Sequence, residues 1–329
     1  MHLEERTFGE LRDLADSVVL VAVAVDVGIF EALGKGAASA EELAAELGFD
    51  ETATLVLLEA LVGVGALERD AQLFRPTERT DRELCDPDLA TYAGRGMPHW
   101  LRALGARTRL GEVLRGGGPL RPRLSARAPE DAARFTAAMA AAPRRRVERI
   151  VDLCLERNPG ARSVLDVGGG PGHMTRAFAR RGLRATRLDT PDIIAHVVGA
   201  HRLGEVANLE VFPADFTRDP LPAGPFDVVL ISNVLHIYGP EQNRRLVRDV
   251  ARVSAPDAVV AVAEFLRGRS RRAPDLSLRM LMTSESGKAY SEAEISSWLD
   301  EAGFGERRVD SLDEDRQLVT AVLGSAPRD

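Results

Sequence analysis

Cysteine is scarce in this chain of 329 residues, which contains only Cys85 and Cys154. Two cysteines cannot build a disulfide framework, and no Cys/His spacing typical of a zinc site occurs. Long hydrophobic runs are also missing, since the longest, residues 18–30, is interrupted by Asp26 and is too short to span a bilayer. The acidic N-terminus lacks the basic-then-apolar order of a secretory signal. These absences predict a cytoplasmic protein that has no bound metal and no membrane partner.

Basic residues are few in the first hundred positions, where eight Lys and Arg stand against twenty Asp and Glu. Residues 101–160 reverse this balance with thirteen against six, and the whole chain has a net charge of -7. Nucleic-acid-binding surfaces are built from clustered Lys and Arg. We therefore expect no nucleic-acid partner. A mainly disordered chain is excluded as well, because 45% of the residues are hydrophobic.

The first hundred residues have the pattern of a winged helix-turn-helix domain: helix, short helix, helix and hairpin. These elements are expected over residues 11–33, 39–47, 52–64 and 66–76. The short helix opens with a capping box, in which Ser39 and Glu42 bind each other's backbone N–H groups. The stretch 18–30 is hydrophobic on almost every face, more than one small domain buries alone. The sequence therefore predicts a dimerisation surface in this domain.

Two further parts follow, which gives predicted boundaries at 1–100, 101–160 and 161–329. The middle part is rich in Gly, Pro and Arg, and we expect linking helices and a lid there. From residue 161, strands alternate with helices, which is typical of a doubly wound parallel α/β sheet. Strands are expected at 163–167, 184–189, 209–212, 226–232, 258–264, 307–310 and 318–323. The last connection is too short for a parallel crossover, so the final strand is expected to run antiparallel.

The most informative motif follows the first strand of that sheet, where Gly168, Gly170 and Gly172 are spaced G-x-G-x-G and Asp166 precedes them. Such glycines let the backbone approach a ligand closely and take positive φ angles. A dinucleotide site places its third glycine one residue later and aims a helix N-terminus at pyrophosphate. The spacing here suits a ligand without phosphates whose amino-acid end is cationic.

Polar side chains also follow the next two strands. Asp189 ends the second strand, where a carboxylate can accept both hydroxyls of a ribose. Asp215 and Phe216 follow the third strand, where a carboxylate can accept an adenine amino group and a phenyl ring can cover the base. Consecutive strands of an open α/β sheet direct their carboxyl ends into one crevice. The sequence therefore predicts an adenosine site in that crevice.

With these residues the sequence resembles the class I S-adenosylmethionine-dependent methyltransferases, with residues 164–172 as motif I. Over nearly the whole chain it is similar to the plant-type and bacterial natural-product small-molecule O-methyltransferases, which join a winged-helix domain to a Rossmann-like domain. The other matching segments are 232–238, 263–265, 287–291 and 298–304. The resemblance implies S-adenosylmethionine as cofactor, a homodimer formed through the N-terminal domain, and a small aromatic or polyketide-like acceptor.

The resemblance also implies roles for single residues. His236, just past the fourth strand, matches the general base that takes the proton of the acceptor hydroxyl. Glu264, at the end of the fifth strand, matches the glutamate that orients this base, and Ser232 matches a cofactor-contacting position. Segments that line the acceptor pocket in the family contribute apolar side chains: Met97, Trp100, Phe135, Met139, Met280 and Met282.

One position departs from the family pattern, because Ala289 stands where a second glutamate is usual. Tyr290 or Tyr238 can supply a hydroxyl instead. The departure leaves two alternatives to O-methylation open: methylation of carbon or nitrogen, and a non-methylating reaction such as hydroxylation or a pericyclic step. A winged-helix regulatory protein is a third alternative, against which the acidic first hundred residues argue.

Overall fold

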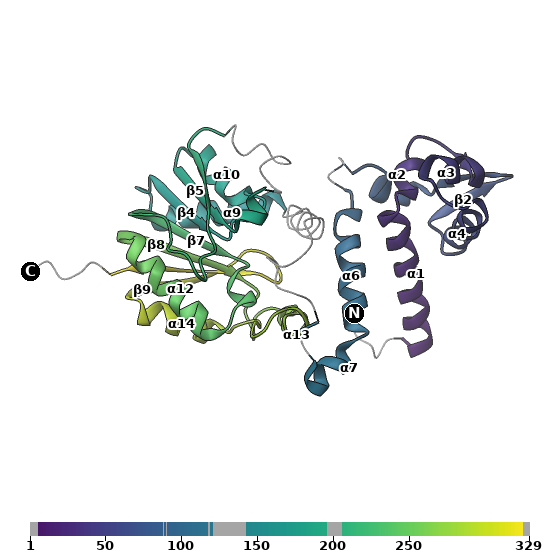
Figure 1. The fold of residues 1–329 in the computed structure, drawn as a ribbon. Helices are drawn as coiled ribbons and strands as arrows, with labels where there is room; N and C mark the ends of the chain where they lie inside the picture. The colour runs from purple at the N-terminus through teal and green to yellow at the C-terminus, as the bar shows by residue number, and fades with distance from the viewer. Residues whose placement is uncertain are drawn as a thin grey trace, which may run out of the picture. The chain divides into compact units, whose positions relative to one another are not determined.

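The computed structural model describes residues 6–324 apart from 88, 90, 118, 121–142 and 196–205. The chain divides into two compact units, Met1–Gly105 and Ala106–Asp329 (Figure 1). The predicted lid within 101–160 stays a prediction, because residues 121–142 lie outside the described part. Within the described ranges, no helix combines the length and the apolar character that a membrane crossing requires.

The N-terminal unit is helical with a small sheet, as the winged-helix pattern predicts. Its helices are α1 (Phe8–Asp26), α2 (Ile29–Leu33), α3 (Ala40–Leu47), α4 (Glu51–Gly63), α5 (Glu78–Thr80) and α6 (Met97–Arg107), with tighter or wider turns at Asp81–Cys85 and Gly94–Gly96. Its strands are β1 (Ala38–Ser39), β2 (Leu67–Asp70) and β3 (Leu73–Pro76), in the antiparallel order β1-β3-β2. The short strand β1 has no sequence pattern of its own and was not predicted.

Local chemistry sets the helix boundaries in this unit. The capping box of α3 forms as predicted, since Ser39 Oγ accepts the Glu42 N–H at 3.2 Å and Glu42 accepts the Ser39 N–H at 2.7 Å. The single helix expected over residues 11–33 is wrong. Gly28 takes a φ of 85° and divides it into α1 and α2.

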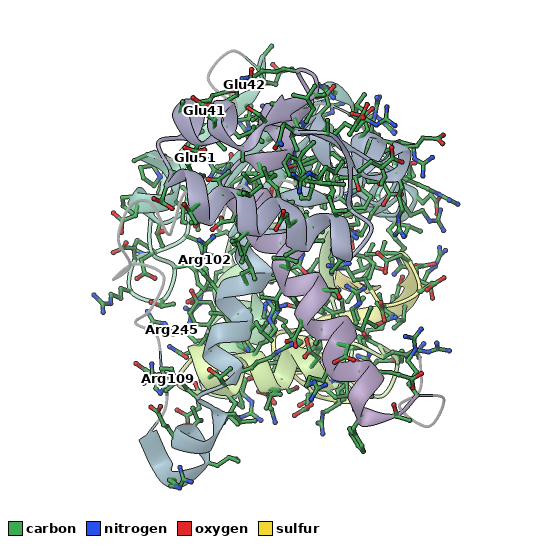
Figure 2. All side chains as sticks on the ribbon, turned by 90° about the vertical axis from the view of Figure 1, so that its right-hand side faces the viewer. Glu41, Glu42, Glu51, Arg102, Arg109 and Arg245 are labelled. Atoms are coloured by element: carbon green, nitrogen blue, oxygen red, sulfur yellow. The ribbon has the colours of Figure 1, made fainter. Side chains whose placement is uncertain are left out.

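Acidic side chains begin both helices of the helix-turn-helix pair. Figure 2 labels Glu41 and Glu42 in the first turn of α3 and Glu51 in the first turn of α4, and all three are exposed. The helix α4 contains no Lys or Arg. Its charge is therefore opposite to what contact with a phosphate backbone requires, and the expectation of no nucleic-acid partner stays a prediction.

The C-terminal unit is built on a seven-stranded sheet in the order β6-β5-β4-β7-β8-β10-β9. Its strands are β4 (Ser163–Val167), β5 (Arg184–Asp189), β6 (Leu209–Pro213), β7 (Phe226–Ser232), β8 (Ser254–Glu264), β9 (Phe304–Ser311) and β10 (Gln317–Leu323). The first five run parallel, and β10 lies antiparallel between β8 and β9. The predicted mostly parallel sheet with an antiparallel final strand is confirmed.

Helices cover both faces of this sheet (Figure 1). The helices of the unit are α7 (Leu110–Glu112), α9 (Arg144–Arg157), α10 (His173–Arg180), α12 (Pro240–Val253), α13 (Ala273–Thr283) and α14 (Glu292–Glu301), with further turns at Val113–Gly117 and Leu235–Ile237. Alternate residues of β7 pack on opposite faces, Val228 and Leu230 against α9 and α10, and Val229 and Ile231 against α12 and α14. Each fully buried Val, Leu or Ile contributes about 1.5–3 kcal/mol, so the sheet is a rigid base for residues at its carboxyl edge.

Candidate active site

The glycine-rich loop joins the end of β4 to the start of α10. Gly168, Gly170 and Gly172 have φ angles of 67°, 50° and 77°, a region that residues with side chains rarely adopt. A Cβ atom on Gly168 would lie 2.6 Å from Cγ2 of Val234, in the segment that follows β7. The loop therefore needs these glycines, and it lies close to the end of the neighbouring strand.

Asp189 ends β5 and binds the loop directly. Its Oδ2 accepts the N–H of Gly170 at 2.8 Å and its Oδ1 accepts the N–H of Thr190 at 2.8 Å. Burial raises the pKa of Asp189, and these two backbone N–H groups act against the increase. Two residues that the sequence predicted separately thus lie together. The carboxylate keeps further lone pairs with which it can accept hydroxyl groups.

Asp166 lies in the interior of the unit, with 1% of its surface exposed. Its Oδ2 accepts both the N–H of Thr175, at 3.2 Å, and the hydroxyl of Thr175, at 2.6 Å. Burial raises the pKa of Asp166 to about 6. Thr175 stands in the first turn of α10, where backbone N–H groups have no intrahelical partner. Asp166 therefore joins β4 to α10, and its predicted contact with the cofactor stays a prediction.

The segment after β6 holds the two residues predicted for adenine. Asp215 Oδ1 accepts the N–H and the hydroxyl of Thr217, at 3.0 and 2.6 Å. The ring of Phe216 packs edge-to-face on Tyr238, with centroids 5.2 Å apart. Since Tyr238 follows β7, this ring contact connects the third and fourth strand ends of the predicted crevice.

The end of β7 has an unusual backbone. Ser232 Oγ accepts the side-chain N–H of Asn233 at 3.1 Å, and Asn233 takes a φ of 57°. Its backbone N–H donates to the carbonyl of Ala263 in β8 at 2.9 Å. Left-handed non-glycine residues gather at functional sites. Asn233 was not predicted, although its place directly after a buried strand was the signal.

His236 and Glu264 form a close pair. The imidazole Nδ1 lies 2.7 Å from Glu264 Oε2, and the side chains are 12% and 4% exposed. The carboxylate accepts a hydrogen bond, so Nδ1 carries the proton of the neutral ring and Nε2 is left as an acceptor. This tautomer is the one that a general base requires.

Of the two tyrosines considered as alternatives, Tyr290 has its hydroxyl engaged. The hydroxyl of Tyr290 donates to the backbone carbonyl of Tyr238 at 2.6 Å, and burial raises the pKa of Tyr290 to about 12. Ala289 is 1% exposed and belongs to an apolar cluster with Leu276 and Met280 of α13. The surroundings of Ala289 are therefore apolar.

The remaining predicted pocket residues are distributed over the chain. Met280 and Met282 are buried on α13, while Met97 and Trp100 are half-buried on α6 in the N-terminal unit. Phe135 and Met139 lie outside the described residues. In the described part of the chain, no group of three or more His, Cys, Asp or Glu residues could hold a metal ion.

Comparisons with known proteins agree with this arrangement. Residues 138–305 match the methyltransferase domain family, and residues 13–82 match the O-methyltransferase dimerisation domain. The chain is 29% identical over 313 residues to 3-hydroxy-5-methyl-1-naphthoate 3-O-methyltransferase of Streptomyces sahachiroi, covering 88% of this chain and 86% of the relative. It is 29% identical over 328 residues to the tetracenomycin polyketide synthesis 8-O-methyl transferase TcmO of Streptomyces glaucescens, covering 93% and 92%.

Solved structures share the fold of the whole chain. The structure of PigF with SAH has a TM-score of 0.81 and 21% sequence identity, and the likeness covers 98% of this chain and 100% of that chain. The methyltransferase match spans more than half of the chain and includes all of the predicted catalytic and cofactor-binding residues. The chain therefore belongs to the methyltransferase domain family, and its N-terminal part belongs to the O-methyltransferase dimerisation domain family.

Proposed function

We propose that this protein methylates a hydroxyl oxygen of a small aromatic, polyketide-like metabolite, with His236 as general base. The observation that carries the proposal is the 2.7 Å contact between His236 Nδ1 and Glu264 Oε2 at the carboxyl edge of the sheet. Two relatives support it, because their names state O-methyl transfer, one to a hydroxynaphthoate and one in tetracenomycin polyketide synthesis.

The residues present fit S-adenosylmethionine. Asp189, held by the N–H of Gly170, retains acceptor capacity for the ribose hydroxyls. Asp215 and Phe216 are assigned to the adenine. The glycine loop, with Gly168, Gly170 and Gly172, is assigned to the amino-acid end together with Asp166 and Ser232. When bound, S-adenosylmethionine supplies an electrophilic methyl group on a sulfonium.

His236 removes the proton that makes the acceptor oxygen a poor nucleophile. A phenol is mostly unionised near neutral pH, so its O–H proton passes to Nε2 as the oxygen reacts. Glu264 accepts the hydrogen bond that Nδ1–H donates, which fixes the ring and stabilises the imidazolium that forms. The apolar cluster of Ala289, Leu276 and Met280 offers an aromatic acceptor carbon surfaces rather than charges.

The active form is proposed to be a homodimer assembled through the N-terminal unit. The match to the O-methyltransferase dimerisation domain supports this assembly. Leu14 and Val18 on α1 are 38% and 40% exposed and lie one helical turn apart. Apolar side chains of this kind along a helix are typical of a surface that a second copy covers.

The proposed function is tested first by binding and then by turnover. Calorimetric titration should show S-adenosylmethionine binding that Asp189→Ala weakens, since two charge-assisted hydrogen bonds of about 1.5–3 kcal/mol each are lost. Unchanged binding would remove Asp189 from the ribose site. Turnover is measured by mass spectrometry on hydroxynaphthoates. Naphthoates without the hydroxyl and naphthylamines are the matched controls, and methylation of these but not of the hydroxyl compounds would reject methyl transfer to a hydroxyl oxygen.

A further inference from the structure

A fully buried arginine, Arg187, has no part in the mechanism above. It lies on β5, two residues before Asp189, and its side chain is among the largest fully buried ones in the described structure. Its Nε, Nη1 and Nη2 atoms have no hydrogen-bond partner among the described residues. The guanidinium stays charged in proteins, and a buried charge without compensation is strongly unfavourable. Negatively charged neighbours must therefore compensate the buried charge of Arg187.

Two carboxylates flank Arg187. Asp166 is its partner in the register of β4 and β5, and Asp189 lies on the same face because side chains alternate along a strand. No ion pair within 4.0 Å connects Arg187 to either of these two described carboxylates. Both instead accept N–H groups, from Thr175 and from Gly170. The guanidinium thus acts on them at longer range, where the low interior dielectric keeps the attraction strong.

The glycine loop packs directly on this group. A Cβ atom on Gly169 would lie 2.9 Å from Cγ of Arg187 and 2.9 Å from Oδ2 of Asp166. Gly169 is the one loop glycine that lacks a left-handed φ among residues 168, 169 and 170. Its missing side chain is therefore explained by the arginine stem beneath the loop.

We propose that Arg187 is a positioning residue for the cofactor, whose buried positive charge keeps Asp189 ionised and so sets the lower pH limit of cofactor binding. The inference rests on the proposed role of Asp189 at the ribose. The positive charge of Arg187 opposes the effect of burial on the pKa of Asp189 and of Asp166. Without this charge, the proton would be held more tightly and the carboxylate would lose acceptor capacity.

The other titratable groups around Asp189 are the same in the wild type and in an Arg187 variant. Arg187 lies on its own strand and Asp166 on β4, while its partner in β6 is Pro213. The loop 168–172 has no ionisable side chain. The other charged or titratable side chains on β5, β6 and α10 and in the segments that follow β5 and β6 nearby are Arg184, Glu210, His173, Arg176, Arg180, Asp192 and Asp215. All of them are unchanged between wild type and an Arg187 variant.

The test is calorimetric titration with S-adenosylhomocysteine between about pH 5 and 9. Arg187→Met removes the charge and keeps much of the stem, so the pH below which binding weakens should rise. A rise of one unit makes binding about tenfold weaker on the acid side and leaves the alkaline side unchanged. Arg187→Lys should keep the wild-type profile. With Asp189→Asn as background, Arg187→Met should no longer move the profile.

Several results would overturn the inference. Weakening by the same factor at every pH would show that Arg187 only supports packing, as would a loss that Arg187→Lys shares. If Arg187→Met does not fold, Asp166→Asn replaces it, and this removal of a negative charge should move the profile to lower pH. If the pH profile of S-adenosylhomocysteine binding does not move, the electrostatic coupling of Asp189 to the charges around it is rejected. Wild-type protein that binds no S-adenosylhomocysteine at any pH rejects the cofactor site itself, a failure distinct from that of Arg187.

Discussion

One carboxylate, that of Glu264, binds both the ring and the backbone of His236. Its Oε2 lies 2.7 Å from Nδ1, and its Oε1 accepts the backbone N–H of His236 at 3.4 Å. His236 lies just after β7, and Glu264 is the last residue of the neighbouring parallel strand β8, in which Ala263 is paired with Ser232 of β7. The sheet register therefore places the base and its partner, so the orientation of the imidazole is set by the rigid part of the unit.

Replacing Glu264 by Gln should lower kcat by about tenfold, since a charge-assisted hydrogen bond becomes a neutral one that is weaker by about 1–1.5 kcal/mol. The glutamine oxygen can still accept the hydrogen bond from Nδ1–H, so His236 stays in place. Single-turnover rates measure the loss. In a His236→Ala background, Glu264→Gln should have almost no further effect, because the two residues act as a unit. If the losses in rate caused by the two substitutions add, Glu264 and His236 act independently.

Replacing Gly169 by Ala should lower the free energy of unfolding by about 1–3 kcal/mol, because the new Cβ overpacks against Arg187 and Asp166. Denaturant titration measures the change. Gly63→Ala is the matched control: Gly63 lies in α4, and nothing stands within 4 Å of a Cβ atom built there. It should be neutral or stabilising, by up to about 1 kcal/mol. Equal effects at the two positions would contradict the packing found beneath the loop.

Asp166 should make stability depend on pH. Burial raises its pKa from 3.8 to about 6, so the folded state holds the proton more tightly than the unfolded state does. Its contribution to the free energy of unfolding therefore falls as pH rises through this window and is constant above it, a change on the order of 2–3 kcal/mol. Melting temperatures of wild type and Asp166→Asn across the window measure it. Parallel curves would show that Asp166 does not titrate there.

The proposed dimer predicts an effect of charge on α1. Val18→Asp should weaken the dimer at least about a hundredfold, since burying an unpaired carboxylate costs several kcal/mol. Light scattering over a dilution series reads the assembly. Val64→Asp, at a valine of similar exposure after α4, is the matched control and should leave the dimer intact. A full-length wild-type protein that is a monodisperse monomer would contradict the proposal.

The sheet could be predicted from the sequence because its inner strands are buried on both faces. Such strands are continuous apolar runs, and β7 has the bounds expected, 226–232. The break at Gly28 was missed because apolar residues continue on both sides of it, and periodicity records burial rather than a change of helix axis.

The candidate site could be predicted only in part. Asp166, Gly170 and Asp189 were recognised by their places at or just after strand ends. The direction of a side chain at a strand end, however, depends on the groups with which it forms hydrogen bonds. Thr175 draws Asp166 inward, and that contact joins a strand to a helix packed on it. Arg187 could have been noticed in the sequence, because it is a charged residue within a strand whose other inner residues are typical of a buried strand. Its meaning required the pairing of β4 with β5, which sequence patterns do not contain.

The proposed base makes the sharpest prediction. His236→Ala should leave S-adenosylhomocysteine affinity near that of the wild type and lower kcat by about 10²–10⁴, the usual contribution of a positioned base. The ring is held by Glu264 and makes no contact with Asp189 or the glycine loop among the hydrogen bonds of the described residues. The loss should therefore fall on the chemical step alone.

Single-turnover rates at saturating cofactor measure the loss of rate, and calorimetric titration measures the affinity. Turnover that persists within a few-fold in His236→Ala would mean that no base is needed at this position. The reaction would then be methyl transfer to carbon or nitrogen, or a step other than methylation, and the apolar surroundings of Ala289 would be read as part of that different chemistry. A loss of rate that is matched by a loss of cofactor affinity would instead mean that the imidazole supports the cofactor site without taking a proton. Only a lost rate at unchanged cofactor affinity supports proton transfer to Nε2.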